Sequence, residues 1–351
     1  MTEPTNFEAS RSKFVVSETT GRSLMLLVFL ILLICIFWWQ TGGSSISPNN
    51  LTNVLANSAV IGVVSLGQLL VIVSGGFDLS VSGTVPLGGV IFALLLNSGW
   101  AIPVALLVAM AATGAFGLIN GVLVGYTKVS PLIATLGTWY LSGGLALTLS
   151  GGIQIPFDNP DDGILTIRAF FGLNNQIWIF LGLCLVVSLV LRFTIFGRSL
   201  YAVGGNREAA RLAGIPVNMV TLAVYLISAA LAGMAGAILA SQLLTGSGTA
   251  GISSALQSIA AVILGGAALT GGVGVVSGTL VGVLLLGVLS NGMAMLSIPS
   301  FFQTMATGVV LLIAVLLSQL RRTKKVLKTS QPDPVSVPIK DPTYQYREDK
   351  R

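Results

Sequence analysis

Asp78 is the first residue whose chemistry stands out, because it is the only Asp, Glu, Lys or Arg between the first apolar run and Lys128. A carboxylate between apolar runs is costly unless it is hydrogen-bonded or solvated, so Asp78 is a functional candidate by default. It could contact a transported solute. Alternatively, Asp78 or Ser80 could cap the helix that follows, with Gly75 and Gly76 forming the tight turn before it. Both interpretations stay open at this point.

Acid–base, thiol and metal chemistry have little support. The chain has no His, and no second carboxylate lies inside an apolar run to work with Asp78. The two cysteines, Cys35 and Cys184, each lie within an apolar run, which favours packing over a disulfide or metal site. We therefore expect no catalytic residues, no metal site and no enzymatic activity.

The second informative feature is a charged segment, Gly204–Pro216, in a chain with only 9% charged residues. Asn206 can cap a helix, and Glu208 suits its positive end. Gly214 is a natural left-handed terminator, and the proline that follows prevents continuation. The sequence predicts a two-turn helix from Arg207 to Ala213, too short to stand alone or to cross a bilayer. A partner protein is the simplest way to hold it.

The elements that must position these residues are membrane helices. With 54% hydrophobic residues and 42 glycines, the chain has the composition of an all-α polytopic membrane protein. About ten apolar runs have nearly the length that crosses a bilayer. The third and eighth are Gly-rich and could be broken or re-entrant. The runs are Leu24–Trp39, Leu51–Val73, Leu79–Asn97, Ile102–Gly125, Pro131–Leu149, Ile177–Phe196, Val217–Gln242, Ser253–Thr270, Val275–Leu296 and Phe301–Leu320.

The positive charges predict the orientation in the membrane. If both termini are cytoplasmic, Arg168 alone of the 18 Lys and Arg residues lies outside, as the positive-inside rule favours. The basic excess then reflects orientation, so we expect no nucleic-acid partner. The predicted regions are a cytoplasmic segment 1–23, a membrane domain 24–320 with a cytoplasmic loop 197–216 and an outer loop 150–176, and a tail 321–351 that is basic and then disordered.

The charged segment resembles the cytoplasmic coupling loop of ABC importer permeases, whose signature is Glu-Ala-Ala, three residues and Gly. Glu208, Ala209, Ala210 and Gly214 match it. Three further stretches are similar to the ribose and simple-sugar permease family and occur in its order. They are Gly75-Gly76-Phe77-Asp78-Leu79-Ser80-Val81, Gly204-Gly205-Asn206 leading into Ala209–Ile215, and Ile259–Gly266 continuing to Gly271-Gly272.

The resemblance implies a permease in the cell inner membrane that imports a small polar solute, such as ribose or a related sugar. It implies a second permease chain, identical or related, two ATPase subunits and a periplasmic substrate-binding protein. The chain itself has no Gly-x-x-x-x-Gly-Lys-Ser/Thr loop, so ATP and magnesium are expected in the partner ATPase. The residues implied to couple to that ATPase are Asn206, Arg207, Glu208, Ala209, Ala210, Arg211 and Gly214. Many family members have acidic residues where this chain has Ala255 and Gln257, so no role for carboxylates is transferred there.

Two further sets of residues are candidates for contact with the solute and with the binding protein. A sugar needs hydrogen-bonding groups along its path without a tight trap, and interhelical hydrogen bonds are the alternative use of the same side chains. The path candidates are Gln68, Asp78, Ser80, Asn120, Gln257, Asn291 and Gln303. The outer loop supplies the docking candidates Asp158, Asp161, Asp162 and Arg168, and a merely solvated loop is the alternative.

Two other functions are the alternatives to an ABC permease: an ion-coupled secondary transporter and an intramembrane enzyme. An ion-coupled secondary transporter would also be apolar and Gly-rich, but it usually carries several intramembrane carboxylates, and Asp78 is nearly alone. An intramembrane enzyme is the least favoured class. The sequence does not specify which solute is carried, and it does not distinguish a homodimer from a heterodimer. Membrane lipid is the remaining expected partner.

Overall fold

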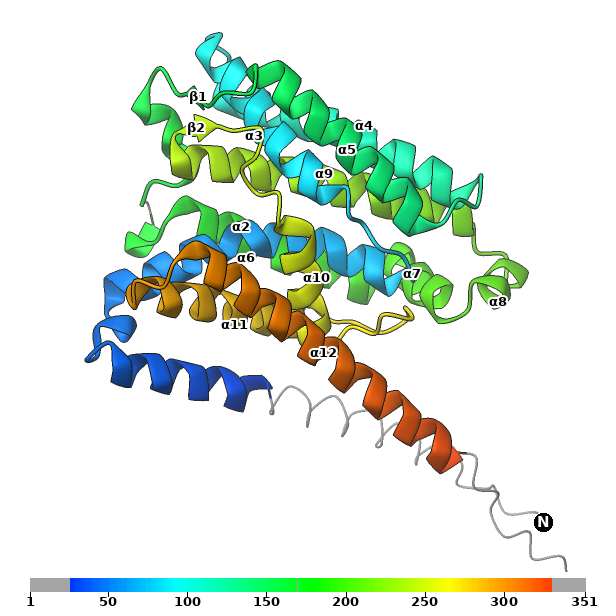
Figure 1. The fold of residues 1–351 in the computed structure, drawn as a ribbon. Helices are drawn as coiled ribbons and strands as arrows, with labels where there is room; N and C mark the ends of the chain where they lie inside the picture. The colour runs from blue at the N-terminus through cyan, green and yellow to red at the C-terminus, as the bar shows by residue number, and fades with distance from the viewer. Residues whose placement is uncertain (1–25, 169, 330–351) are drawn as a thin grey trace, which may run out of the picture.

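The computed structural model describes residues 26–168 and 170–329, and nearly all of this part is helical (Figure 1). The described elements are a first helix Leu26–Gln40, η1 Ser44–Ile46, α2 Pro48–Val73, α3 Val81–Asn97, α4 Ile102–Gly125, α5 Pro131–Ser150, β1 Ile155–Pro156, η2 Pro160–Leu165, η3 Phe170–Gly172, α6 Asn175–Phe193, α7 Ile195–Gly205, α8 Arg207–Leu212, α9 Val217–Leu243, β2 Thr245–Gly246, α10 Ser254–Leu264, α11 Val276–Met295 and α12 Ser300–Thr329.

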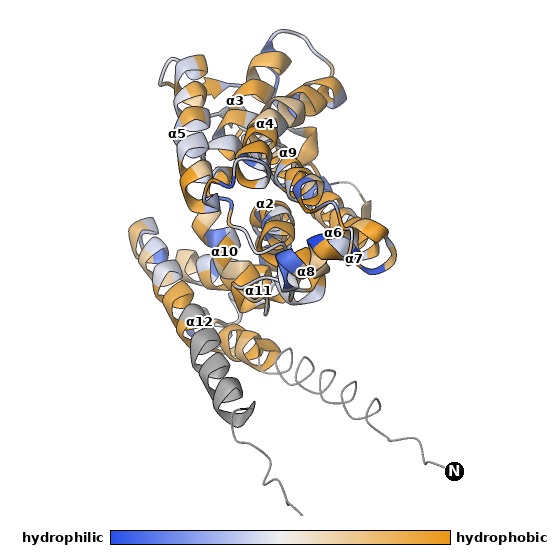
Figure 2. Ribbon diagram, turned by 90° about the vertical axis from the view of Figure 1, so that its right-hand side faces the viewer, coloured by the Kyte–Doolittle hydropathy of each residue, from blue (hydrophilic) through white to orange (hydrophobic). Residues whose placement is uncertain are grey.

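Six of the described helices are long and apolar enough to cross a membrane, namely α2, α4, α5, α6, α9 and α11. The expectation of an all-α polytopic membrane protein is therefore confirmed. Many large apolar side chains on these helices are exposed, and Figure 2 shows mostly apolar residues along the helices and polar residues at α8. Apolar surfaces of this kind suit a hydrocarbon surrounding rather than water.

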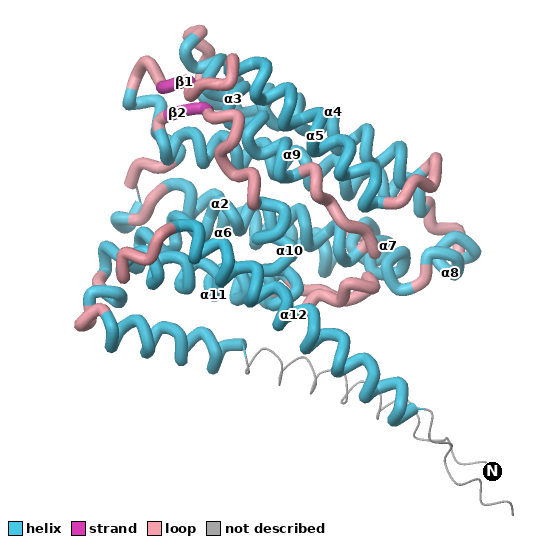
Figure 3. The backbone as a smooth tube through the Cα atoms, in the orientation of Figure 1, coloured by secondary structure: helices cyan, strands magenta, loops and turns pink. Residues whose placement is uncertain are grey.

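The third and eighth apolar runs contain the shorter helices α3, of 17 residues, and α10, of 11 residues. At a rise of about 1.5 Å per residue, α10 spans only about half of a ~30 Å hydrocarbon core. It ends at Leu264, earlier than the predicted run, because Gly266, Gly271 and Gly272 adopt positive φ angles of 100°, 84° and 74°. Figure 3 shows long loops leading into both α3 and α10. The eighth run is therefore a broken helix, as its glycines suggested, whereas α3 is one continuous helix over nearly all of the third run.

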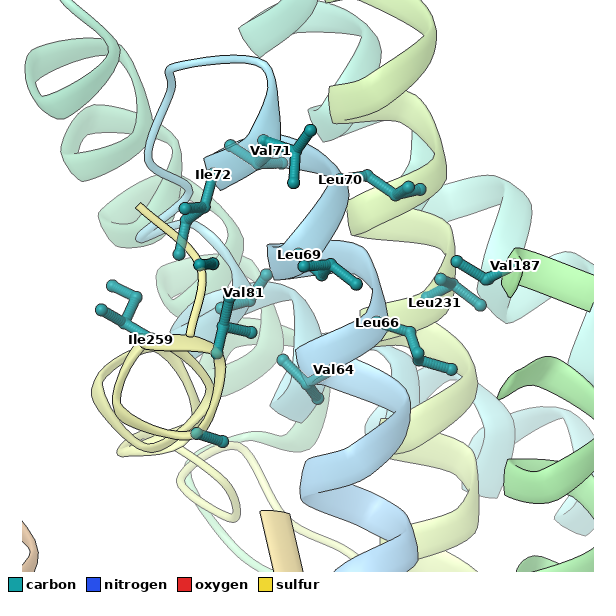
Figure 4. Close-up of a cluster of buried hydrophobic side chains, with 14 of the residues drawn as sticks. Val64, Leu66, Leu69, Leu70, Val71, Ile72, Val81, Val187, Leu231 and Ile259 are labelled. Atoms are coloured by element: carbon teal, nitrogen blue, oxygen red, sulfur yellow. The ribbon is translucent and has the colours of Figure 1, made fainter. Parts of the chain in front are cut away.

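Two helices, α2 and α9, form the centre of the bundle and are the most buried of the long helices. In Figure 4, side chains of α2 lie between Ile259 of α10 on one side and Leu231 of α9 with Val187 of α6 on the other. Glycines let backbones approach closely: a Cβ on Gly236 of α9 would lie 2.0 Å from the carbonyl oxygen of Val85 in α3. Small residues at such contacts are a common basis of helix association in membranes.

The loop 197–216 contains a helix that the sequence analysis did not predict. α7 is capped at its N-terminus by Thr194, whose hydroxyl accepts a hydrogen bond from Gly197 N–H. Leu200 and Val203 bury against the bundle. On the opposite side of the molecule, β1 pairs antiparallel with β2 and fastens the loop 150–176 to the end of α9.

Candidate functional site

The short helix α8 has the form that its sequence predicts, although it ends one residue earlier. The Asn206 side chain caps it by accepting hydrogen bonds from the N–H groups of Glu208 and Ala209, at 3.1 and 3.0 Å. Gly214 follows with φ of 79°. The side chains of Arg211 and Glu208 form an exposed ion pair of 2.5 Å, a kind of pair worth about 0–1 kcal/mol. The outer face of α8 is thus presented to its surroundings.

The inner face of α8 is attached to α9. Ala210 is buried, and its carbonyl oxygen accepts a hydrogen bond from Ile215 N–H at 3.1 Å. The Arg207 guanidinium donates to the hydroxyl of Thr221 in the second turn of α9, at 3.2 Å. A displacement of α8 would therefore act directly on α9.

Three glycine-containing segments that lie far apart in the sequence meet beside α8. Gly272 N–H donates to the carbonyl oxygen of Val73, at the end of α2, over 2.9 Å. A Cβ on Gly204 would lie 1.7 Å from that oxygen and 2.6 Å from Gly272 N. A Cβ on Gly271 would lie 2.7 Å from Gly204 O and 2.9 Å from Gly75 Cα. We call this contact of Val73, Gly75, Gly204, Gly271 and Gly272 the glycine junction. It joins the segments after α2 and α10 to the end of α7.

Asp78 is fully buried at the centre of a hydrogen-bonded network. Its Oδ1 accepts from the backbone N–H and the hydroxyl of Ser80, at 3.0 and 2.5 Å, and its Oδ2 accepts from Ser228 Oγ at 2.8 Å. The Ser80 hydroxyl also accepts from Asn120 Nδ2 at 2.9 Å, and Asn120 Oδ1 accepts from Thr138 Oγ1 at 2.7 Å. We call these five residues the Asp78 network. It ties the segment before α3 to α4, α5 and α9.

Asp78 was expected either to contact a solute or, like Ser80, to cap α3. Ser80 makes no side-chain capping bond to α3. Asp78 instead orders the turn before α3, because it accepts the N–H of Ser80. With 0% of its surface exposed, Asp78 meets no solute in this conformation.

One face of α9 connects α8 to the Asp78 network. Thr221, Tyr225 and Ser228 follow one another at helical spacing of four and three residues, which places them on one side of α9. Thr221 binds Arg207, Tyr225 donates its hydroxyl to the Phe77 carbonyl oxygen at 3.1 Å, and Ser228 binds Asp78. The sequence analysis missed Thr138, Thr221 and Ser228. Their only signal was a hydroxyl inside an apolar helix, which many other residues of this chain share.

The path candidates fall into two groups and one isolated residue. Asp78, Ser80 and Asn120 belong to the Asp78 network. Gln68 is fully buried in α2, and within the described part of the chain its amide group has no hydrogen-bond partner.

The remaining three path candidates line one cavity of about 340 Å³ between α2, α10, α11 and α12. None of the described residues that line it is charged. Asn291 pairs reciprocally with Asn50 at 2.9 and 3.1 Å, and Gln303 accepts from Ser290 at 3.0 Å. The buried hydroxyl of Ser58 has no partner within the described residues. The lining residues are Asn57, Ser58, Ile61, Gln257, Val283, Leu286, Gly287, Ser290, Asn291, Ala294, Ser300, Gln303, Thr304 and Thr307. The cavity combines neutral amides and hydroxyls with apolar walls.

The charged residues of the outer loop differ in their exposure and contacts. Asp158 is exposed, and its N–H donates to Asn97 Oδ1 at 3.2 Å. Asp162 is half-buried. Arg168 is exposed and forms an isolated β-bridge with Asn174. The side chain of Asp161 lies outside the part that the structure describes.

Comparison with known proteins finds a family of transport permeases and several sugar permeases as relatives. Residues 50–317 match the family model described as "Branched-chain amino acid transport system / permease component". The chain is 34% identical to the L-arabinose ABC transporter permease protein AraH of Azospirillum brasilense, over 90% of this chain and 93% of that protein. It is 38% identical to the ribose import permease protein RbsC of Bacillus subtilis, over 79% and 86%, and 37% identical to RbsC of Escherichia coli K12, over 78% and 88%. No solved structure matches the chain significantly.

Proposed function

The chain belongs to the family of branched-chain amino acid transport system permease components, and from this premise we propose that it imports a monosaccharide of the ribose or arabinose type. It is the membrane-spanning permease subunit of an ABC importer of the cell inner membrane, and a separate ATPase hydrolyses the ATP. ATP and magnesium would bind that ATPase, because this chain has no phosphate-binding loop.

The cavity chemistry supports a sugar over an amino acid as the solute. An amino acid carries an ammonium and a carboxylate, and a site for it is expected to supply opposite charges or helix termini. The 340 Å³ cavity combines apolar walls with neutral amides and hydroxyls, and the only helix N-terminus among its described lining residues is that of α12 at Ser300. These groups suit a neutral polyol, and the named relatives are permeases for L-arabinose and ribose. The candidate path residues at this cavity are Gln257, Asn291 and Gln303.

The observation that carries the proposed mechanism is the attachment of α8 to the glycine junction and to α9. We propose that α8 docks on the ATPase through its exposed face, with Asn206 fixing the helix and Glu208, Arg211 and Gly214 shaping the contact. Closure of the ATPase pair would move α8, and backbones in direct contact at Gly204 and Gly272 cannot absorb that motion locally. The displacement would pass to α2, to the segment after α10 and along α9.

The Asp78 network is the proposed receiver of this motion. On α9, the Tyr225 hydroxyl donates to the Phe77 carbonyl oxygen and the Ser228 hydroxyl donates to the Asp78 carboxylate. Arg207 of α8 donates to Thr221 on the same face of α9. A shift of α9 would therefore change the position of the segment before α3. The ion-coupled alternative is disfavoured, because the carboxylate accepts three hydrogen bonds and 0% of it is exposed.

We propose the membrane orientation and the other partners together with this function. Ten membrane crossings with both termini in the cytoplasm would place α8 on the ATPase side and the loop 150–176 on the side of the substrate-binding protein. Asp158, Asp161, Asp162 and Arg168 are the docking candidates there. A second permease chain would complete the translocation unit, with membrane lipid around it.

The test uses proteoliposomes that contain the permease, its ATPase and its binding protein. Glu208→Lys combined with Arg211→Glu keeps an ion pair within α8 but reverses the charges on its outer face. We expect normal membrane insertion and loss of ATP-driven uptake of labelled ribose or arabinose, and the same from Gly214→Pro. Normal uptake in both variants would show that α8 is only a connecting loop. Uptake of leucine but of neither sugar would refute the solute assignment while leaving the coupling assignment intact.

A further inference from the structure

A groove of about 540 Å³ lies between α6, α7 and the start of α11, away from the polar cavity. Its walls are mostly apolar. Both α6 and α11 are long and apolar enough to cross the membrane, so a groove between them opens to the acyl chains of the bilayer. The lining residues are Cys184, Leu185, Ser188, Leu191, Arg192, Tyr201, Val275, Val276, Ser277 and Leu280.

One end of the groove is positively charged. Arg192 is exposed in the last turn of α6, with its guanidinium carbon 5.3 Å from the centre of the Phe193 ring. Among the described residues, the single ion pair is that of Glu208 with Arg211, so Arg192 has no carboxylate partner there. Hydroxyl groups of Ser188 and Ser277 lie on the two facing walls. The groove thus has mostly apolar walls and, at one end, an arginine with no carboxylate partner among the described residues.

We propose that this groove binds one anionic glycerophospholipid, with its phosphate at Arg192 and an acyl chain between α6 and α11. A free inorganic anion would leave the apolar walls in water, and a neutral sugar would leave Arg192 without a counter-charge. A phospholipid satisfies both parts, and basic pockets between membrane helices are suited to anionic headgroups. The site goes beyond the proposed transport function, which it uses only to assign the lipid to the cytoplasmic leaflet.

The lipid would also brace the coupling machinery. Tyr201 of α7 lines the groove and donates its hydroxyl to the carbonyl oxygen of Gly274 at 2.7 Å. A tyrosine hydroxyl is protonated at neutral pH, because its ordinary pKa is about 10, and burial raises the pKa of Tyr201 further. Gly274 lies two residues after Gly272 of the glycine junction. A lipid in the groove would therefore contact α7 through Tyr201 and the start of α11, the two helices that lead into and out of the junction.

Native mass spectrometry of the purified permease tests the proposal, after exchange into vesicles of equal phosphatidylglycerol and phosphatidylcholine. We expect wild type to retain phosphatidylglycerol preferentially. Arg192→Gln should lower that retention about fivefold, the effect of removing about 1 kcal/mol of attraction per basic side chain, while phosphatidylcholine retention is unchanged. Arg198→Gln is the matched control, because Arg198 is exposed on α7 but does not line the groove.

A second variant, Ser277→Trp, fills the groove without changing charge and should reduce retention of both lipids. Three results would overturn the proposal: no preference for phosphatidylglycerol in wild type, equal losses in Arg192→Gln and Arg198→Gln, or full retention in Ser277→Trp. None of these readouts depends on transport, so a failed sugar assignment would leave the lipid result interpretable.

Discussion

Replacing Gly204 with alanine should break the glycine junction and uncouple the ATPase from transport. The new Cβ would lie 1.7 Å from the Val73 carbonyl oxygen, whereas real Cβ contacts stay above 3.0 Å. The backbones must therefore separate by about 1.3 Å, the difference between those two distances. All three obstructing atoms, Val73 O, Val73 C and Gly272 N, belong to the backbone, so no side chain can rotate away.

Two effects contribute to the loss of folding stability in Gly204→Ala. Overpacking at a close contact costs about 1–3 kcal/mol. The separation also lengthens the 2.9 Å bond from Gly272 N–H to Val73 O, and loss of one such bond costs about 0.5–1.5 kcal/mol. We expect Gly204→Ala to lower the free energy of unfolding by about 1.5–4.5 kcal/mol in total.

The neighbouring glycine supplies the control. A Cβ on Gly205 meets no atom within 4 Å, so Gly205→Ala should change the free energy of unfolding by less than about 0.5 kcal/mol. The assays are SDS-induced unfolding in mixed micelles and ATP-driven uptake in proteoliposomes. We expect Gly204→Ala to bind the ATPase yet lose most uptake, and Gly205→Ala to behave as wild type. Equal behaviour of the two variants in both assays would refute the reasoning.

Three further predictions concern other parts of the molecule. Asp78→Ala removes the acceptor of three buried donors and should destabilise the protein by about 3–5 kcal/mol; the near-isosteric Asp78→Asn should cost much less, and similar SDS unfolding curves for both would contradict the network. Asn206→Ala removes both capping bonds of α8 and should cost that helix about 1 kcal/mol, seen as faster hydrogen exchange in 207–212 while Asn206→Gly changes exchange only slightly; unchanged exchange in both would argue against the cap. Neutralising Asp158, Asp161 and Asp162 together should weaken docking of the substrate-binding protein, chiefly through a slower association rate at low salt, with little effect on folding; unchanged affinity in detergent would remove the docking assignment.

Local features of the fold could be predicted from the sequence, because they depend on residues close together in the chain. The cap at Asn206, the left-handed Gly214 and the breaks after α2 and α10 all depend on backbone preferences of a few neighbours. α7 was also within reach, since Thr194 can cap it and its buried residues recur at helical spacing. It was missed because charged residues beside it suggested a loop.

The assembled site could not be predicted, because its contacts join residues far apart in the sequence. Nothing in the spacing of Gly75, Gly204 and Gly271 says that their backbones touch. Asn291 illustrates the opposite problem. A polar side chain in an apolar helix can line a path or pair with another helix, and only the structure shows that its amide pairs with Asn50. The sequence therefore identified the important segments without their partners.

The broken segment after α10 also constrains the order in which the protein can assemble. Buried backbone groups must find hydrogen-bond partners. Here Gly272 N–H relies on Val73 at the end of α2, and the Gly274 carbonyl relies on Tyr201 of α7. Both partners precede the segment in the chain, so they are synthesised before it leaves the ribosome. The N-terminal two thirds of the molecule thus serve as the template on which this last irregular segment is inserted.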